Sequence, residues 1–349
     1  MTWRIFGLIL LLLVICDSDV ALAQQKSESS GISQSPQAVH DSAGDYDRED
    51  LGSLSLGSRK LHSVAPFLGE KDEYPDFTRE LIQVQWRSGD AIDLYVIKPR
   101  GTTRPPAIMY LYSYPSETDR FRDDKYCQKV TASGYAAVGF VSAFTGQRYH
   151  DRPMKEWFVS QFQEALTESV HDVQMILDYL ATRGDLDMDH IGIFSQGSGA
   201  TIAILAASVE PRIQALDAIQ PWGDWSRWMA TSSLIPDSER SDYLKADFLL
   251  RIAPLDPVNR LRHLETKSVH LQFVLDDSVT PAAAVKQMMA SAPSRDQVVE
   301  YQTKREQYDQ LAGGKAFDWI KKQLRTPGLR PPGAMATGTP ATTQGANRY

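Results

Sequence analysis

Along the middle of the chain, segments in which apolar residues alternate with polar ones or form short runs are followed by segments with helical periodicity. Together they predict alternating strands and helices. Residues 80–86 and 91–98 alternate apolar and polar side chains around a Ser-Gly-Asp turn at 88–90, which predicts a β-hairpin. Largely apolar runs typical of buried strands lie at 107–112, 135–141, 191–194, 215–219, 270–275 and 298–301. Helical segments are predicted at 120–133, 161–181, 199–209 and 317–324. This order predicts an α/β domain with a mostly parallel central sheet and helices on both faces.

The two ends of the chain differ in composition from this middle part. Arg4 precedes an apolar run at 5–16, which is too short for a bilayer core of about 30 Å, and Ala21-Leu22-Ala23 follows as a cleavage site. We therefore predict a signal peptide at 1–23, export to the periplasm or the medium, and no stable membrane span after cleavage. An uncleaved membrane anchor is the alternative. The polar composition of 24–60 and of 326–349 predicts a disordered leader and a disordered tail around a folded domain at 61–325.

Composition and charge exclude several classes of function. The net charge of −7 comes without a basic stripe, which argues against a nucleic-acid partner. Cys16 would leave with the signal peptide, so Cys127 would have no partner for an internal disulfide. No HExxH, CxxC or phosphate-binding glycine loop is present, and we expect neither a metal nor a cofactor.

The segment at 191–200, IGIFSQGSGA, has the pattern of a strand, a sharp turn and a helix of small residues. The G-x-S-x-G nucleophile elbow of hydrolases works in this context. With Ser195 and Gly199 as the small flanking residues, the tip of the turn is Gly197. Glycine accepts a positive φ but has no side chain to act as a nucleophile. The alternative register makes Ser198 the nucleophile. In the first register the backbone N–H of Ser198 can still stabilise an oxyanion.

On these features, residues 77–324 resemble the α/β-hydrolase superfamily, nearest its prolyl-oligopeptidase and dienelactone-hydrolase branches. The resemblance implies a catalytic triad in the chain order Ser, Asp, His. Asp277 follows a predicted strand and precedes Pro281 by four residues, which matches the acid; capping of the next helix is its alternative role. The histidine is missing, because none occurs beyond His270. The predicted triad is therefore degenerate.

Other residues at the same edge of the sheet are candidates for a site. His150, in a loop after a strand, is the candidate for a substitute base, with a structural or solvent-facing role as the alternative. The tryptophan-rich segment after the strand at 215–219 forms either a stacking wall for a ligand or the packed core of a lid. The candidates for ligand contact are Tyr112, Ser113, Trp222, Asp224 and Trp225.

Three functions follow from this interpretation. The first is an exported, catalytically defective hydrolase that retains a crevice for a small-molecule, peptide or sugar ligand. The second is an active serine hydrolase, similar to an esterase or a peptidase, that uses Ser198 with Asp277 and a non-standard base such as His150. The third is a structural domain that carries a functional leader and tail.

Overall fold

The computed structural model describes residues 53–56, 64–87, 89–144, 162–264, 268–294 and 297–325. The predicted signal peptide, most of the predicted leader, the predicted tail and His150 lie outside these residues. Within the described ranges, no helix has the length and apolar character needed to cross a membrane.

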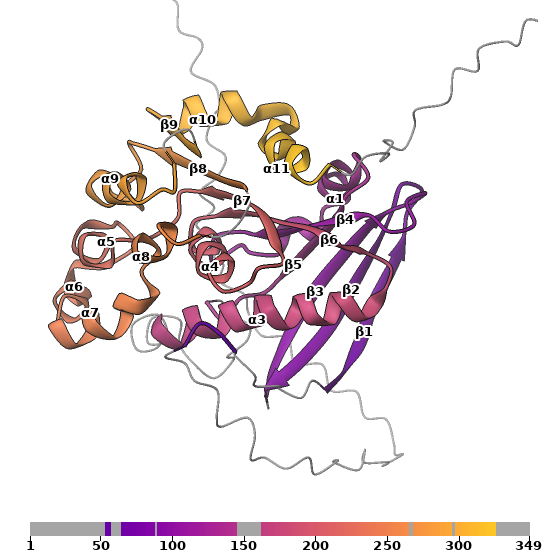
Figure 1. The fold of residues 1–349 in the computed structure, drawn as a ribbon, viewed down its shortest axis with the longest axis horizontal. Coiled ribbons are helices and arrows are strands. Elements are labelled where there is room, and N and C mark those ends of the chain that lie inside the picture. Colours follow the sequence, from indigo (N-terminus) through magenta and orange to yellow (C-terminus); the bar gives the residue numbers. More distant parts are fainter. Residues whose placement is uncertain are drawn as a thin grey trace, which may run out of the picture. The chain divides into compact units, whose positions relative to one another are not determined.

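The described residues form one nine-stranded sheet with the strand order β1-β2-β3-β5-β4-β6-β7-β8-β9 (Figure 1). The pairs from β1 to β5 along this order are antiparallel, and the pairs from β5 to β9 are parallel. The predicted hairpin and the mostly parallel sheet are therefore confirmed. The strands are β1 (Val64–Glu73), β2 (Phe77–Arg87), β3 (Asp90–Pro99), β4 (Pro106–Leu111), β5 (Ala136–Phe140), β6 (Asp187–Gln196), β7 (Ile213–Ile219), β8 (Ser268–Val274) and β9 (Val298–Tyr301).

Strand β1 is an element that the sequence pattern does not predict. Its residues are exposed along almost its whole length, so its side chains carry no period-two alternation of apolar and polar types. Its backbone pairs with β2, and the register shifts at two points, between Val64 and Phe67 and between Leu68 and Glu70. Such irregularities are typical of edge strands, where they limit pairing with other chains.

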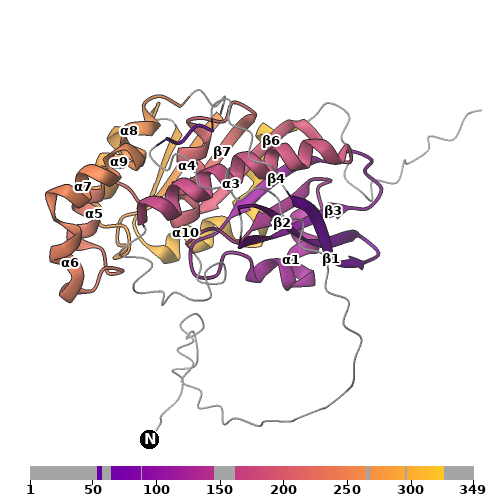
Figure 2. The ribbon, with the colours of Figure 1, turned by 90° about the horizontal axis from the view of Figure 1, so that it is seen from below.

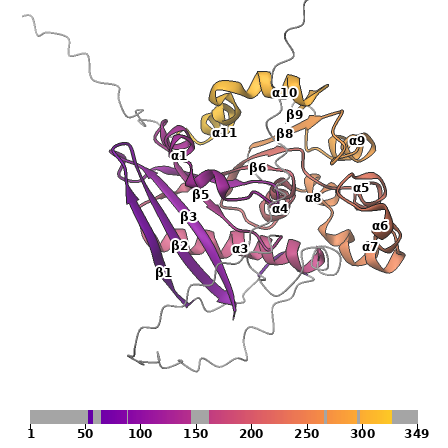
Figure 3. The ribbon, with the colours of Figure 1, turned by 180° about the vertical axis from the view of Figure 1, so that it is seen from behind.

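Helices lie on both faces of the sheet and enclose two apolar cores. Along β4, Ile108 and Tyr110 point into one core, whereas Met109 and Leu111 point into the other. Figure 2 shows α3 and α1 on opposite sides of the sheet, and Figure 3 shows α1 beside α11. The helices are α1 (Asp124–Thr131), α3 (Phe162–Arg183), α4 (Ser198–Ala207), α5 (Trp225–Thr231), α6 (Asp237–Tyr243), α7 (Ala246–Ile252), α8 (Pro257–Leu261), α9 (Ala282–Ala290), α10 (Lys304–Leu311) and α11 (Asp318–Gln323), with 3-10 turns η2 (Asp119–Arg122), η3 (Ala253–Leu255) and η5 (Ala312–Phe317).

The predicted helix at 120–133 is divided into η2 and α1 at Asp123. This residue has an extended backbone, with φ −86° and ψ 114°. Its carboxylate accepts hydrogen bonds from the backbone N–H groups of Lys125 and Tyr126. Asp123 is therefore an N-cap, which starts a new helix instead of continuing the first turn.

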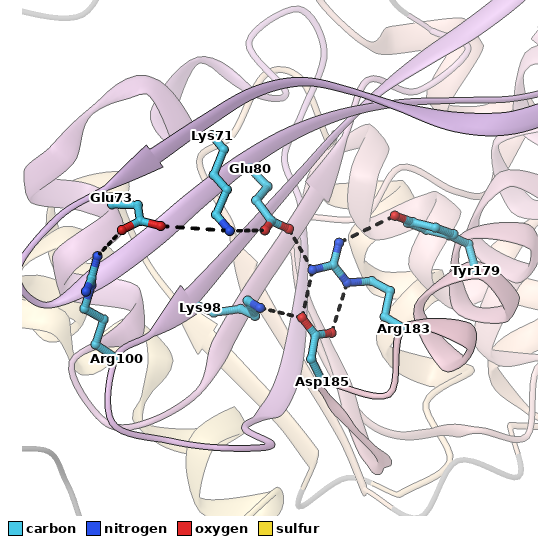
Figure 4. Close-up of polar contacts among 8 residues, drawn as sticks. All are labelled: Lys71, Glu73, Glu80, Lys98, Arg100, Tyr179, Arg183 and Asp185. Carbon is cyan, nitrogen blue, oxygen red and sulfur yellow. Dashed lines mark hydrogen bonds and ion pairs between the residues drawn. The ribbon is translucent and has the colours of Figure 1, made fainter.

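A network of ion pairs fastens the end of α3 to the antiparallel part of the sheet (Figure 4). Glu80 on β2 lies 2.7 Å from Arg183 Nη2 and 3.7 Å from Lys71 Nζ on β1. Arg183 also pairs with Asp185, which is bonded by Lys98 on β3. Burial acts to raise the pKa of Asp185, but the hydrogen bonds from Arg183 and Lys98 outweigh it and lower that pKa to about 2.

Four residues of the predicted leader, 53–56, are described, and they lie against α3. Leu54 is buried in the core that α3 and α4 cover. The carbonyl oxygen of Ser53 lies 2.9 Å from Nε2 of His171 on α3. His171 is buried in this contact, so it serves the packing of the chain.

Candidate functional site

The connection from β6 to α4 is a sharp turn whose tip is Gly197. Strand β6 ends at Gln196, Gly197 has φ 55° and ψ −122°, and α4 begins at Ser198. The N–H of Gly197 donates to the carbonyl of Ile219, which ties the tip to the end of β7 at 2.9 Å. A side chain other than hydrogen is strained at this φ, which suits glycine.

Gly199 allows α4 to approach the end of β4. A Cβ atom on Gly199 would lie 2.2 Å from the carbonyl oxygen of Leu111 and 2.8 Å from that of Tyr112. Both contacts are with backbone, so no side-chain rotation can relieve them. The close packing of α4 on the end of β4 therefore requires glycine at position 199.

The side chain of Ser113 fills the space above Gly197. A Cβ atom on Gly197 would lie 2.3 Å from Ser113 Oγ and 2.7 Å from Ser113 Cβ. Ser113 is partly buried in the loop after β4. A hydroxyl group thus lies near the tip. It belongs to the loop after β4 and not to the elbow between β6 and α4. The sequence places Ser113 among the ligand-contact candidates and gives no signal of its contact with Gly197.

The two serines beside the tip are enclosed. Ser198 is 0% exposed, and its Oγ accepts a hydrogen bond of 2.9 Å from the backbone N–H of Tyr114. Ser195 is also buried, and its Oγ donates to the carbonyl of Asp217 at 3.0 Å. Both hydroxyl groups therefore make contacts inside the protein.

Two described histidines on the sheet, His190 and His270, are bonded to carboxylates. His190 Nδ1 lies 2.8 Å from a carboxylate oxygen of Asp187 within β6. His270 on β8 pairs with Asp217 at 3.0 Å and stacks on Trp319. Neither ring is bonded to Ser113 or Ser198. The residue proposed as a substitute base, His150, lies outside the described residues, so its role stays a prediction.

Asp277 follows β8, and its carboxylate has three partners: the backbone N–H of Val279, which donates to Oδ1 at 3.3 Å within the turn, and two side chains. Lys304 Nζ lies 2.8 Å from its Oδ1, and Gln220 Nε2 donates to its Oδ2 at 2.9 Å. Lys304 is the first residue of α10, in the segment after β9 where the resemblance implies the histidine. Gln220 also fixes the end of β8, because its Oε1 accepts from the N–H of Val274 at 2.7 Å. Both carboxylate oxygens are thus engaged without an imidazole.

Sequence reasoning missed Lys304 and Gln220 as neighbours of Asp277. Lys304 is visible as a basic residue in the segment searched for the histidine, and that is the signal that could have found it. Gln220 gives no such signal. Gln220 follows the last residue of β7 and has a positive φ of 51°, which the residue type does not predict.

The tryptophans after β7 are packed together beneath the helices α5 to α8. Trp222 stacks on Trp228 with 5.0 Å between ring centroids, and Trp225 meets Trp228 edge to face at 5.8 Å. Phe144 and Phe162 extend the cluster. All five side chains are buried. The cluster therefore forms the core that holds these helices onto the sheet.

Most polar groups of the tryptophan-rich segment after β7 make hydrogen bonds or ion pairs inside the protein. Trp225 Nε1 donates to the carbonyl of Leu255 at 3.1 Å. Asp224 pairs with Arg227 at 2.5 Å, and the backbone N–H of Asp224 donates to Asp256. Burial raises the pKa of Asp256, while its hydrogen bonds from backbone amides oppose that rise. The indole N–H of Trp222 differs from these groups, because no hydrogen bond of the described residues uses it. Its Nε1 would lie 3.5 Å from a Cβ atom on Gly197.

Tyr112 belongs to the core beneath α1 and α11. Its ring packs with Phe121 and Phe194, its hydroxyl meets that of Tyr126, and the guanidinium of Arg120 lies 4.4 Å from its ring centroid. Burial raises the pKa of Tyr112 to about 12. The proposed ligand contact of Tyr112 therefore has no support in this position.

We expect the protein to lose stability above about pH 10, in part through Tyr112. Between pH 10 and 12 the unfolded phenol has lost its proton and the folded one keeps it, so rising pH favours unfolding by up to about 1.4 kcal/mol per pH unit. Urea denaturation from pH 8 to 11.5 measures this slope, which should be shallower in Tyr112→Phe. Tyr308→Phe, at an exposed tyrosine, is the control; equal slopes in both variants would contradict the prediction.

Comparison with known proteins shows which fold the chain has. No family model and no curated protein matches the chain. Among solved structures, acetyl xylan esterase 1 from Thermoanaerobacterium sp. JW/SL YS485 has a TM-score of 0.59 at 14% identity, with 80% of this chain and 93% of that chain covered. An acetyl xylan esterase from Paenibacillus sp. R4 has a TM-score of 0.54 at 13% identity, covering 76% and 90%. A cold-adapted esterase from an Arctic intertidal metagenomic library has a TM-score of 0.51 at 9% identity, covering 75% and 100%. The chain has the α/β-hydrolase fold.

Proposed function

We propose that this chain is a ligand-binding protein that has the α/β-hydrolase fold but does not perform serine-hydrolase catalysis at its elbow. The observation that carries the proposal is the position of Ser113, which fills the space that a Cβ atom on Gly197 would take. The tip has no side chain, and the space for one is filled from the neighbouring loop. Loss of the triad serine alone typically reduces turnover by about 10⁶-fold, so one such change ends ordinary catalysis.

The environment of Asp277 supports the same proposal. In a triad this carboxylate orients a histidine, which takes the proton from the nucleophile. Here it is paired with the ammonium of Lys304 and the amide of Gln220. An ammonium bonded to a carboxylate has no lone pair with which to accept a proton. The charged pair therefore stabilises the ends of β8 and α10 without supplying a base.

The ligand that we propose is a small molecule, a peptide or a sugar, bound where the strands end beside Gly197. The names of the similar structures, acetyl xylan esterases among them, make an acylated saccharide the first class to test. With a signal peptide predicted at 1–23, we propose that this binding takes place in the periplasm or the medium. Export is part of the proposal.

An active serine hydrolase is the second candidate function. The observation in its favour is that a hydroxyl, that of Ser113, does lie beside the tip of the elbow. Ser198, the nucleophile of the alternative register, would first have to leave its hydrogen bond with Tyr114. Either serine would need a base such as His150.

Labelling with a fluorophosphonate probe separates the two functions. We expect no covalent adduct on the purified protein under conditions in which an active serine hydrolase reacts fully. Mapping of any adduct by mass spectrometry identifies the residue, and Ser113→Ala and Ser198→Ala test the assignment. A stable adduct at Ser113, Ser195 or Ser198 would refute the ligand-binding proposal and establish an activated serine.

A further inference from the structure

We propose that two copies of this chain form a dimer through the outer face of α7. Exposed large apolar side chains gather at two places in the described part of the chain, on β1 and in the segment that carries α5 to α7. Figures 1 and 3 show β1 and α7 at opposite ends of the fold. Leu250 on α7 is 72% exposed, the largest exposed fraction among these side chains, and its burial by a partner would be favourable.

The outer face of α7 has a leucine at its centre. It consists of five exposed residues: Ala246, Asp247, Leu250, Arg251 and Ala253. The αR backbone of Ala253 continues the helical turn beyond Ile252, which is fully buried on the opposite side. Residues three or four positions apart lie on the same side of a helix. Leu250 is therefore flanked by the two charged residues on one side and by the two alanines on the other.

The two charged residues of this face have no ion-pair partner among the described residues. Asp247 and Arg251 are four positions apart on the helix, yet they do not pair with each other. The adjacent Lys245, by contrast, pairs with Asp242 at 2.7 Å. The guanidinium of Arg251 lies 5.8 Å from the ring centroid of Phe248, and no hydrogen bond of the described residues uses its N–H groups. Both charges are thus available to a partner molecule.

A second copy of the chain matches these charges. In a two-fold dimer both subunits use the same surface, and two copies of α7 would lie antiparallel. With the axis level with the midpoint between Asp247 and Arg251, the carboxylate of each copy lies opposite the guanidinium of the other. The two Leu250 side chains then meet near the axis. Ala246 lies beside Ala253 of the second copy, where small side chains let the helices approach closely.

The size of this face predicts a reversible dimer. The helix α7 has seven residues, and interfaces that bury less than about 1,200 Å² usually belong to weak or transient complexes. Leu244, in the connection before α7, is also exposed and extends the apolar surface. The leucines supply most of the affinity, whereas the charge pairs fix the antiparallel register and disfavour other partners. We expect monomer and dimer to exchange at micromolar concentrations.

Sedimentation velocity of the purified protein across the micromolar range tests this proposal. We expect one reversible equilibrium between monomer and dimer. Leu250→Asp should raise its dissociation constant at least about tenfold, because each subunit loses an apolar contact and gains a charge near the axis. Leu68→Asp makes the same change at an exposed leucine of β1 and should leave the dissociation constant unchanged. Circular dichroism should show the same fold in both variants.

Reversal of the charges tests the orientation of the two copies. Asp247→Arg and Arg251→Asp should each raise the dissociation constant severalfold, because each places like charges opposite one another. The protein that carries both changes should return close to the original constant, since the two charges only exchange places. The proposal is overturned if the protein stays monomeric throughout the range, if Leu68→Asp weakens the dimer as much as Leu250→Asp, or if the double change is as weak as the single ones.

Discussion

Trp228→Ala is expected to lower the free energy of unfolding by about 3–5 kcal/mol, the range for truncation of a large aromatic side chain in a core. Trp228 is 0% exposed and stacks on Trp222, with Trp225 against its edge. Its removal leaves a cavity between α5 and the sheet that the neighbouring rings cannot fill without leaving their own contacts. Urea denaturation at neutral pH, followed by circular dichroism, measures the loss.

Trp319→Ala is the matched control for this variant. The chemical change is the same, but Trp319 is partly exposed: it stacks on His270 and packs at the margin of the core that contains Tyr110 and Phe317. We expect it to cost clearly less, because less apolar area returns to water and little cavity is left. Equal losses in the two variants would mean that the aromatic cluster does not stabilise the fold more than a surface contact does.

The stability of the cluster also bears on the proposed site. Trp222 has its indole N–H near Gly197 and its ring face on Trp228. The stack on Trp228 holds the Trp222 ring in one orientation, so Trp222 joins the packed cluster to the tip of the elbow.

Local sequence signals were sufficient for most of the fold. The alternation at 80–86 and the apolar run at 107–112 predicted strands that the structure has as β2 and β4. The spacing of small residues at 195–199 predicted the strand–turn–helix connection in which Gly197 has its positive φ. Strand β1 was missed because its side chains face solvent on both sides, and such a strand leaves no periodic pattern.

The contacts within the candidate site were less predictable, because they join segments that are distant in the chain. Asp277 was identified from its spacing to Pro281, but its partners come from the end of β7 and the start of α10. Ser113, which fills the space above Gly197, comes from the loop after β4, more than eighty residues earlier in the chain. Neither residue type nor periodicity encodes such distances. The roles of Gly197 and Asp277 as former triad positions remain predictions.

Gly197→Ser is expected to lower the free energy of unfolding by about 2–5 kcal/mol. A residue with a Cβ atom costs about 1–2 kcal/mol in the left-handed region, and overpacking typically adds about 1–3 kcal/mol. The overpacking arises because the new Cβ atom would lie 2.7 Å from Ser113 Cβ and 2.3 Å from its Oγ. Gly184→Ser separates the two costs, since Gly184 has φ +69° and nothing within 4 Å of its Cβ position.

Combining Gly197→Ser with Ser113→Gly removes the clash and leaves the strain. The double variant should regain about 1–3 kcal/mol relative to the sum of the two single changes, a coupling that a double-mutant cycle in urea measures. It would also carry a serine at the tip with space around it. We still expect no fluorophosphonate labelling, because Asp277 remains paired with Lys304 and no base is restored. Labelling of the new serine would show that a base reaches the tip, and the loss of catalysis would then depend on residues 197 and 113.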